Sequence, residues 1–240
     1  MLIHGFTQTG ASWDPVLPHL VGSGVVAHAP DLPDSPDLWM AAAELSAWIV
    51  AHVGPDPVAI VGYSMGGRIA LHLALAHPER VDRLILIGAT GGLDTGDERD
   101  RRRSADAALA DTIEAGGSGG IDGFLDRWVA QPLFAGLPKT AADRAARSRD
   151  PALLAGWLRH LGTGTQEPLW DRLHTISVPV LCVAGAEDAK FVALARRLNQ
   201  AIGPQAGVSL VADAGHACHL EQPGAFAALL RNFLQGDPSG

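Results

Sequence analysis

The sequence has few of the features that mark secreted, disulfide-linked or membrane-spanning proteins. It contains two cysteines, Cys182 and Cys218, which give no disulfide framework, and this fits a reduced, cytoplasmic compartment. No apolar run approaches the roughly 18 residues that a membrane-spanning helix needs. The segment Met1 to Phe6 has no basic stretch followed by an apolar one, so no signal peptide is expected.

Positive charge is also scarce. The chain has 18 basic and 26 acidic residues, a net charge of −8 at pH 7, which argues against a general nucleic-acid-binding protein. A local basic pocket for an anionic ligand is still compatible with this charge. His219 lies three residues after His216, but no second ligand pair has zinc spacing, so we expect neither a metal nor a cofactor. The sequence does not decide between a monomer and a homo-oligomer.

Apolar strands that alternate with helical patterns dominate the rest of the chain. A length of 240 residues suits one large domain or a core with an insertion. Residues 1–4 are typical of the end of a strand, and the predicted strands that follow are 25–28, 58–61, 81–89, 178–184 and 208–212. The predicted helices are 12–20, 37–53, 64–77, 191–202 and 223–234. Continuous apolar strands alternating with helices predict an α/β fold with a mostly parallel sheet covered on both faces.

Composition changes after Gly92. Residues 93–172 are rich in Arg, Asp, Ala and Trp, have no strand-like run, and are typical of several short helices. Residues 116–120, Gly-Gly-Ser-Gly-Gly, indicate a flexible break among them. We therefore predict a core formed by residues 1–92 and 173–240, with residues 93–172 inserted as a helical cap.

The most informative motif is Gly62-Tyr63-Ser64-Met65-Gly66, which reads G-x-S-x-G between an apolar strand and a helix. Such a strand–turn–helix arrangement presents a serine hydroxyl at the carboxyl edge of a sheet, and the glycines let the flanking strand and helix approach closely. The motif alone is short, but this context predicts that Ser64 is a nucleophile rather than an incidental turn residue.

A reactive serine needs a base and an acidic group that orients the base. In this type of sheet the partners follow in the order Ser, acid, His. Asp188 and His216 each follow an apolar strand, so we predict Ser64, Asp188 and His216 as a catalytic triad. Glu187 and Asp213 are competing acids, but only one of two neighbouring acids can point inward, and Asp213 stands where a turn residue is expected.

Two backbone N–H groups are expected to form an oxyanion hole. One belongs to Met65, which follows the serine, and the other to Phe6 in the turn after the first strand. Gly5 lets the chain turn there. A plain strand–helix connection is the alternative for this turn.

Together these motifs resemble the α/β-hydrolase superfamily over essentially the whole chain. The resemblance rests on His4-Gly-Phe6, the serine motif, Gly185-x-x-Asp188 and Ala214-Gly-His216. Further segments resemble the 2-succinyl-6-hydroxy-2,4-cyclohexadiene-1-carboxylate synthases: Gly62–Arg68, Trp128–Phe134, Leu161–Thr165 and Gly185–Phe191. The fold implied is the α/β-hydrolase fold with a helical cap inserted before the acid-bearing strand. The chain departs from the family in its short segment before His4.

The reaction implied by this resemblance is a carbon–oxygen lyase step of menaquinone synthesis. A base removes a ring proton from a small polycarboxylate substrate and pyruvate is eliminated, so cations and N–H donors are needed. Arg68 lies one helical turn after Ser64, on the same face. Arg102 and Arg147 are implied as further carboxylate ligands, with Tyr63 and Trp128 as pocket walls.

Several alternatives remain open at the level of the sequence. The run 99–103 contains Arg101, Arg102 and Arg103, any of which fits the cap position, and the run is also typical of a solvated helix face. Arg147 fits a surface residue equally well, and Trp128 fits a packing role. For function, the alternatives are a serine esterase or C–C bond hydrolase, and a non-catalytic binding protein on the same scaffold.

Overall fold

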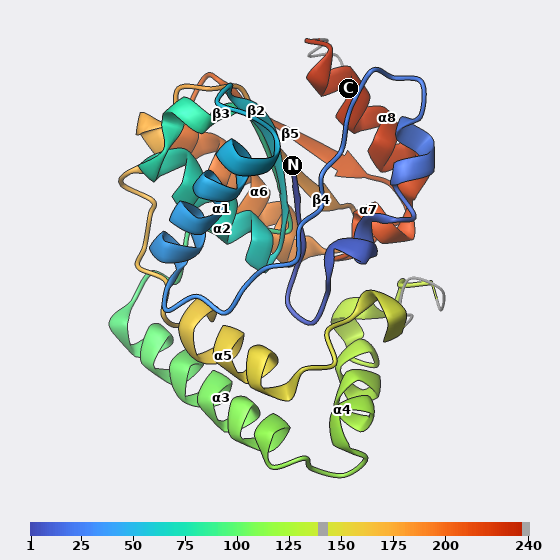
Figure 1. Ribbon diagram of the computed structural model, residues 1–240. Coiled ribbons are helices and arrows are strands. Elements are labelled where there is room, and N and C mark those ends of the chain that lie inside the picture. Colours follow the sequence, from blue (N-terminus) through green and yellow to red (C-terminus); the bar gives the residue numbers. More distant parts are fainter. Residues whose placement is uncertain (139–143, 237–240) are drawn as a thin grey trace.

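The computed structural model describes residues 1–138 and 144–236, which contain a sheet of five parallel strands in sequence order (Figure 1). The strands are β1 (Leu2–Ile3), β2 (Val58–Tyr63), β3 (Val81–Ile87), β4 (Val180–Gly185) and β5 (Ala206–Val211). Tyr63, the last residue of β2, pairs with Ile87, the last residue of β3, and Leu86 of β3 pairs with Cys182 of β4. The carboxyl ends of the central strands therefore lie nearly level. Loops that leave these ends are therefore brought together at one edge of the sheet.

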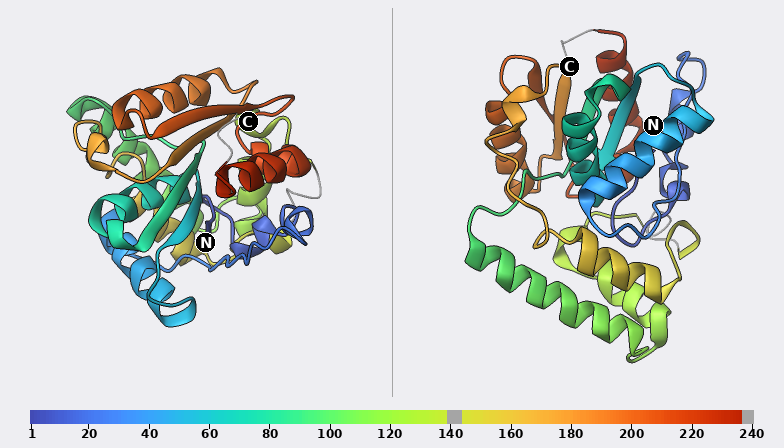
Figure 2. Two further views of the ribbon diagram at one scale, coloured as in Figure 1. Left: turned by 90° about the horizontal axis from the view of Figure 1, so that it is seen from above. Right: turned by 60° about the vertical axis from the view of Figure 1, so that its left-hand side comes forward.

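Helices cover both faces of the sheet, as the continuous apolar strands predict. On one face lie α1 (Leu38–His52), α2 (Met65–Ala76) and α6 (Ala189–Ile202); on the other lie α8 (Pro223–Leu234) and the 3-10 turns Gly10–Trp13 and Leu17–Leu20 (Figure 2). Leu84 of β3 packs in the first hydrophobic cluster and its neighbour Ile85 packs in the second. Both side chains are fully buried, and burial of an aliphatic side chain of this size contributes about 1.5 to 3 kcal/mol.

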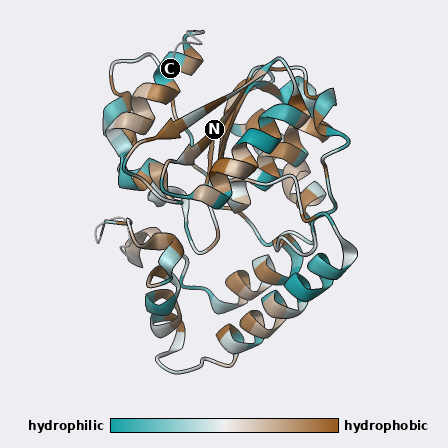
Figure 3. Ribbon diagram, turned by 180° about the vertical axis from the view of Figure 1, so that it is seen from behind, coloured by the Kyte–Doolittle hydropathy of each residue, from teal (hydrophilic) through white to brown (hydrophobic). Residues whose placement is uncertain are grey.

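The helix that the sequence predicted from Asp37 is confirmed and shows how the local signals operate. Asp37 is the N-cap of α1, and its carboxylate accepts a hydrogen bond of 2.8 Å from the N–H of Met40. The buried face of α1 includes Leu38, Leu45 and Ile49, at helical spacing. In Figure 3 the strands are mostly brown, whereas teal residues are found on the outer helices.

The described residues between 96 and 161 supply three α-helices beyond the carboxyl edge of the sheet, and we call this region the cap. Its helices are α3 (Gly96–Glu114), α4 (Gly120–Val129) and α5 (Pro151–Leu161) (Figure 1). Thr95 and Glu98 form a capping box that begins α3, which is longer than the short helices expected. Helix α3 ends immediately before the glycine-rich break, and it packs beside α5 (Figure 2).

Two predictions about the first 30 residues are wrong. Residues 25–28 form no strand: Leu2 donates a backbone hydrogen bond to His28, but β1 is two residues long and offers no continued ladder, and Val26 is 80% exposed. Residues 12–20 form two short 3-10 turns instead of one helix, because Pro15 and Pro18 lack the N–H groups that a continuous α-helix requires there.

At the other end of the chain, β5 begins two residues before the predicted start, and the closing helix is found with its predicted bounds. A four-residue helix that was not predicted, α7 (Cys218–Glu221), lies between them. Among the described residues, no helix has the length and apolarity to cross a bilayer.

Candidate active site

Ser64 lies in a strained turn between β2 and α2. Its φ is 52° and its ψ is −107°, a conformation that non-glycine residues rarely adopt. The turn is tight because Gly62 and Gly66 have no side chains: a Cβ on Gly62 would overlap the backbone of Gly66, and one on Gly66 would overlap the carbonyl of Ile3. The strain is held in place by the buried strand and helix, and it directs the hydroxyl into a cavity.

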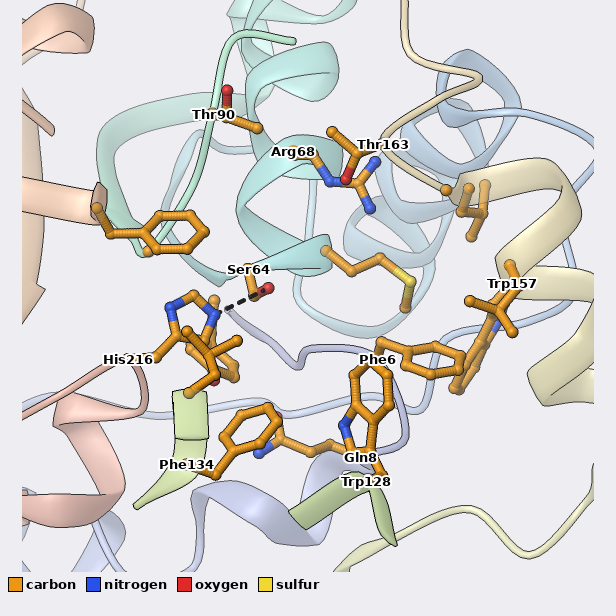
Figure 4. A pocket seen from close by; sticks show the side chains of 18 of the residues that line it. Phe6, Gln8, Ser64, Arg68, Thr90, Trp128, Phe134, Trp157, Thr163 and His216 are labelled. Atoms are coloured by element: carbon orange, nitrogen blue, oxygen red, sulfur yellow. Dashed lines mark hydrogen bonds between the residues drawn. The ribbon is translucent and has the colours of Figure 1, made fainter. Parts of the chain in front are cut away.

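His216 lies between Ser64 and Asp188, the three residues that the sequence picked out. Its Nε2 is 3.4 Å from the Ser64 Oγ (Figure 4). Its Nδ1 is 3.2 Å from an oxygen of Asp188. The imidazole is 4% exposed and packs against the ring of Phe191 at 4.3 Å between centroids. The three side chains thus form a hydrogen-bonded chain that can move a proton from the hydroxyl to the imidazole.

Asp188 is fixed by its position as the N-cap of α6. Its second oxygen accepts the N–H of Phe191 at 3.1 Å. Burial raises the pKa of Asp188, but the hydrogen bonds from His216 and Phe191 outweigh burial, and the net pKa is lowered. Asp188 is therefore ionised at neutral pH and selects the tautomer of His216 with its proton on Nδ1. Glu187 and Asp213 are exposed, and it is Asp188 that is hydrogen-bonded to the imidazole.

The backbone N–H groups of Phe6 and Met65 donate no hydrogen bond within the described residues, and both residues line the cavity. The Phe6 turn is closed by Gln8, whose side-chain oxygen accepts the Gly5 N–H at 3.0 Å and whose own N–H donates to the Gly5 carbonyl at 3.2 Å. Thr7 has a φ of 69° within this turn. Two unpartnered amides beside a serine hydroxyl are the arrangement that an oxyanion hole requires.

His4 anchors the start of the same turn as a neutral imidazole. Its Nδ1 donates to the Gly5 carbonyl and its Nε2 accepts the N–H of Leu32, each at 3.0 Å. The side chain is fully buried, and burial lowers its pKa from 6.5 to about 4. In the unfolded chain the imidazole takes up a proton near pH 6.5, so this contribution to stability is present above that pH and is lost as the pH falls toward 4.

We accordingly expect the free energy of unfolding to fall as the pH is lowered from 6.5 to 4.5. His4→Gln should reduce the slope by up to one proton, or about 1.4 kcal/mol per pH unit. Urea unfolding at a series of pH values measures this slope. His174→Gln, a change at an exposed histidine, is the control and should leave the slope as in the wild type. An unaltered slope in His4→Gln would mean that His4 is not the group responsible.

The cavity beside Ser64 has a volume of about 170 Å³ and a cationic lining. Ser64, His216 and Arg68 lie around it, with Phe134 and Trp128 across from them (Figure 4). Its cationic side chains are those of Arg68, Arg102, Arg147 and Lys190, and no carboxylate lines it among the described residues. This lining favours an anionic ligand with several negative groups, whereas sites for neutral esters are mainly apolar.

Arg68 is, together with Arg147, one of the two buried cations of this lining. Its side chain is 6% exposed, and its Nη1 has no hydrogen-bond partner in the described structure. Burial and the nearby charge of Arg102 lower the pKa of Arg68 to about 10, while Asp106 acts in the opposite direction. The guanidinium is thus charged at neutral pH and lacks a partner for one of its amino groups, an arrangement that a substrate carboxylate would complete.

The structure distinguishes the three consecutive arginines of α3. Arg102 lines the cavity, and its Nε donates to both oxygens of Asp106 at 2.9 Å. Arg101 donates instead to the backbone carbonyl of Asp97, and Arg103 to that of Gly164. Arg102 is therefore the one of the three that faces the site. Asp106 holds its Nε and leaves the terminal amino groups available for a ligand.

Arg147 joins the cap to the turn that carries Phe6. Its Nη1 donates to the Thr7 hydroxyl at 2.6 Å, its backbone forms an isolated antiparallel bridge with Gln8, and its Nε has no partner within the described chain. The side chain is 5% exposed, and burial lowers its pKa. The surface role considered from the sequence is thus wrong for Arg147.

Aromatic rings form the rest of the wall. Trp128 packs edge-on against Phe6 at 4.9 Å between centroids, and its Nε1 is buried without a partner in the described residues. Tyr63 is 3% exposed, contacts the ring of His216, and has its pKa raised by burial. Tyr63 and Trp128 thus line the cavity at the positions that the sequence suggested.

Sequence reasoning missed several residues that the structure places in the cavity. They are Gln8, Thr90, Phe134, Trp157, Thr163 and Lys190. Lys190 lies two residues after the predicted triad acid Asp188. Its positive charge beside the predicted site could therefore have marked it as a ligand for an anionic substrate. Gln8 follows Phe6 just as closely, but its importance comes from contacts with Gly5 and Arg147 that local sequence does not reveal. Within the described residues, no cluster of three or more His, Cys, Asp or Glu could hold a metal ion.

Known proteins resemble this chain over most of its length. The profile of the alpha/beta hydrolase family matches residues 1–229. A 2-succinyl-6-hydroxy-2,4-cyclohexadiene-1-carboxylate synthase of Serratia proteamaculans is 35% identical over 80% of this chain and 73% of its own. A Bacillus subtilis protein, to which the same activity is provisionally assigned, is 35% identical over 97% of this chain and 88% of its own. The solved structure of MenH from S. aureus, 28% identical, covers 98% of this chain and 93% of its own with a TM-score of 0.87.

Proposed function

The chain belongs to the alpha/beta hydrolase family, and we propose that it is the lyase that forms 2-succinyl-6-hydroxy-2,4-cyclohexadiene-1-carboxylate in menaquinone synthesis, by eliminating pyruvate from a polycarboxylate cyclohexene. The observation that carries this proposal is the cavity next to Ser64, which has four cationic side chains and no carboxylate among its described lining. A substrate with several carboxylates complements this lining, because guanidinium groups bind carboxylates through paired hydrogen bonds.

In the proposed mechanism, Ser64 and His216 act together as the base. His216 Nε2 takes the hydroxyl proton, and Ser64 Oγ removes the proton from the ring carbon next to a conjugated carboxylate. The electron pair of that C–H bond forms the new ring double bond. The C–O bond to the pyruvyl group breaks, and pyruvate departs as its enolate, which takes a proton back from the His216 imidazolium and ends as the keto form.

Negative charge develops on the conjugated carboxylate during proton removal. The unpartnered N–H groups of Phe6 and Met65 are positioned to receive it, and they do so without reorganising in the reaction. The arginines bind the remaining carboxylates and orient the ring over Ser64. Asp188 stabilises the imidazolium that forms on His216. In this scheme Ser64 acts as a base and forms no acyl intermediate.

The second candidate is a serine esterase or C–C bond hydrolase with the same triad. Its supporting observation is the complete Ser64, His216 and Asp188 chain, which would also serve nucleophilic attack on a carbonyl. The cationic lining argues against it, since a neutral ester gains nothing from these four cations, of which Arg68 and Arg147 are buried and would lack a counter-charge.

The two candidates make opposite predictions for a pair of assays. We expect fast pyruvate release from the enolpyruvyl cyclohexene intermediate of the pathway, and slow hydrolysis of p-nitrophenyl acetate and butyrate. Both are followed with the same enzyme preparation, by coupled detection of pyruvate and by absorbance of p-nitrophenolate. Rapid ester cleavage with no pyruvate formed would replace the lyase with the hydrolase.

A further inference from the structure

The loop that carries His216 is held by a carboxylate outside the triad, that of Glu221 at the end of α7. One oxygen of Glu221 accepts the N–H of Gly215 at 2.7 Å, and the other accepts the N–H of Ala217 at 3.0 Å. These are the two residues that flank His216. The backbone before and after His216 is thus fixed to one side chain. Hydrogen bonds from backbone amides to a charged acceptor are about twice as strong as those between neutral groups.

Other contacts leave the loop little freedom in other directions. A Cβ at Gly185, the end of β4, would overlap the carbonyl groups of Ala214 and Gly215, so the loop lies directly against the sheet. Asp213, with a φ of 51°, turns the chain out of β5, and its carbonyl accepts the side-chain amide of Gln222. The sheet thus limits movement of the loop on one side, and Glu221 fixes it on the other.

Glu221 also connects this loop with the segment that follows α4. Gly136 lies so close to Glu221 that a Cβ there would overlap one carboxylate oxygen, the same Oε2 that accepts the Gly215 N–H. A methyl group at position 136 would displace that oxygen and weaken its hydrogen bond to Gly215. The location of the carboxylate therefore depends on an empty space that glycine provides.

We propose that Glu221 is a positioning residue for His216, which keeps Nε2 within reach of the Ser64 hydroxyl. The inference rests on the proposed function only in assuming that His216 accepts the Ser64 proton. The distance of 3.4 Å between Nε2 and Oγ is already at the long end of a hydrogen bond, so a small displacement of the loop would break the proton path. A misplacement of 1 Å in such a site can reduce a rate by about 100-fold.

The test uses Glu221→Gln in the full chain, with two rates as readouts. The first is pyruvate release. The second is reaction of Ser64 with a neutral alkyl fluorophosphonate: the Ser64 oxygen bonds to phosphorus, fluoride leaves, and His216 takes the hydroxyl proton. Glutamine keeps the size of the side chain but offers an NH₂ group to one of the two N–H donors. We expect kcat and the labelling rate to fall about tenfold or more, with KM within about twofold.

Glu187→Gln is the matched control, because it removes the same charge from an exposed side chain near Asp188 that contacts neither amide. Both of its rates should equal those of the wild type. Gly136→Ala displaces the Glu221 carboxylate by steric overlap and should lower both rates by a smaller factor. If Glu221→Gln does not fold, Gly136→Ala tests the positioning role by itself. Wild-type rates per folded molecule in either variant, even with a lower melting temperature, would overturn the positioning role.

The two readouts separate this inference from the proposed function. A wild-type protein that reacts with the fluorophosphonate but releases no pyruvate would disprove the lyase and leave the role of Glu221 supported, provided that Glu221→Gln slows labelling. A wild-type protein that is not labelled at all would overturn the inference, since His216 would then not activate Ser64.

Discussion

Replacing Ser64 with alanine is expected to lower kcat for pyruvate release about 10²- to 10⁴-fold, the contribution typical of a positioned base. The Ser64 hydroxyl is the group that His216 Nε2 meets at 3.4 Å, and without it the imidazole has no path to the substrate ring. Binding should change little, because the arginines that hold the carboxylates are unaffected. A coupled assay for pyruvate, run over a range of substrate concentrations, gives kcat and KM separately.

The double variant of Ser64→Ala with His216→Ala makes this prediction more specific. If the two residues form one base, the double variant should be about as slow as either single variant, because the first substitution already abolishes proton abstraction by the pair. Ser104→Ala, on the exposed side of α3, is the control and should retain full activity. Full activity in Ser64→Ala, or losses that multiply in the double variant, would exclude a joint base.

The central geometry could be predicted from sequence because each part is encoded near a strand end. Ser64 follows β2 directly, Asp188 follows β4 by three residues and His216 follows β5 by five. Parallel strands that end nearly level bring such loops together, so the order of the motifs along the chain was enough to predict a meeting point. The distances themselves required the structure.

The failures lie where structure depends on distant partners. Val25 and Val26 have strong strand propensity, but a strand also needs a hydrogen-bonding neighbour, and the two-residue β1 does not supply one over that length. The bond from Arg147 to Thr7 joins residues 140 positions apart. Nothing local indicates that pairing, and the same holds for the choice of Arg102 among three adjacent arginines, which depends on how α3 packs on the rest of the cap.

Arg68→Met is expected to separate activity from stability. Loss of the guanidinium should lower kcat/KM for pyruvate release about 30-fold or more, because truncating one side of a desolvated charge pair costs about 2 to 5 kcal/mol. In the absence of substrate, however, the Arg68 Nη1 has no partner in the described structure, and its burial opposes folding. Methionine fills similar space without charge, so the free energy of unfolding should stay the same or rise by up to about 3 kcal/mol.

Activity and stability are expected to change in opposite directions, because a cavity that holds unpaired cations for a polyanionic ligand destabilises the protein when the ligand is absent. Arg101→Met is the matched control: it removes an exposed arginine one position from Arg102, and neither activity nor stability should change appreciably. Urea unfolding without substrate and kcat/KM with substrate measure the two effects. A less stable Arg68→Met protein with wild-type kcat/KM would show that Arg68 supports the fold and does not bind substrate. Greater stability with strongly reduced activity is the outcome that assigns the Arg68 guanidinium to a substrate carboxylate.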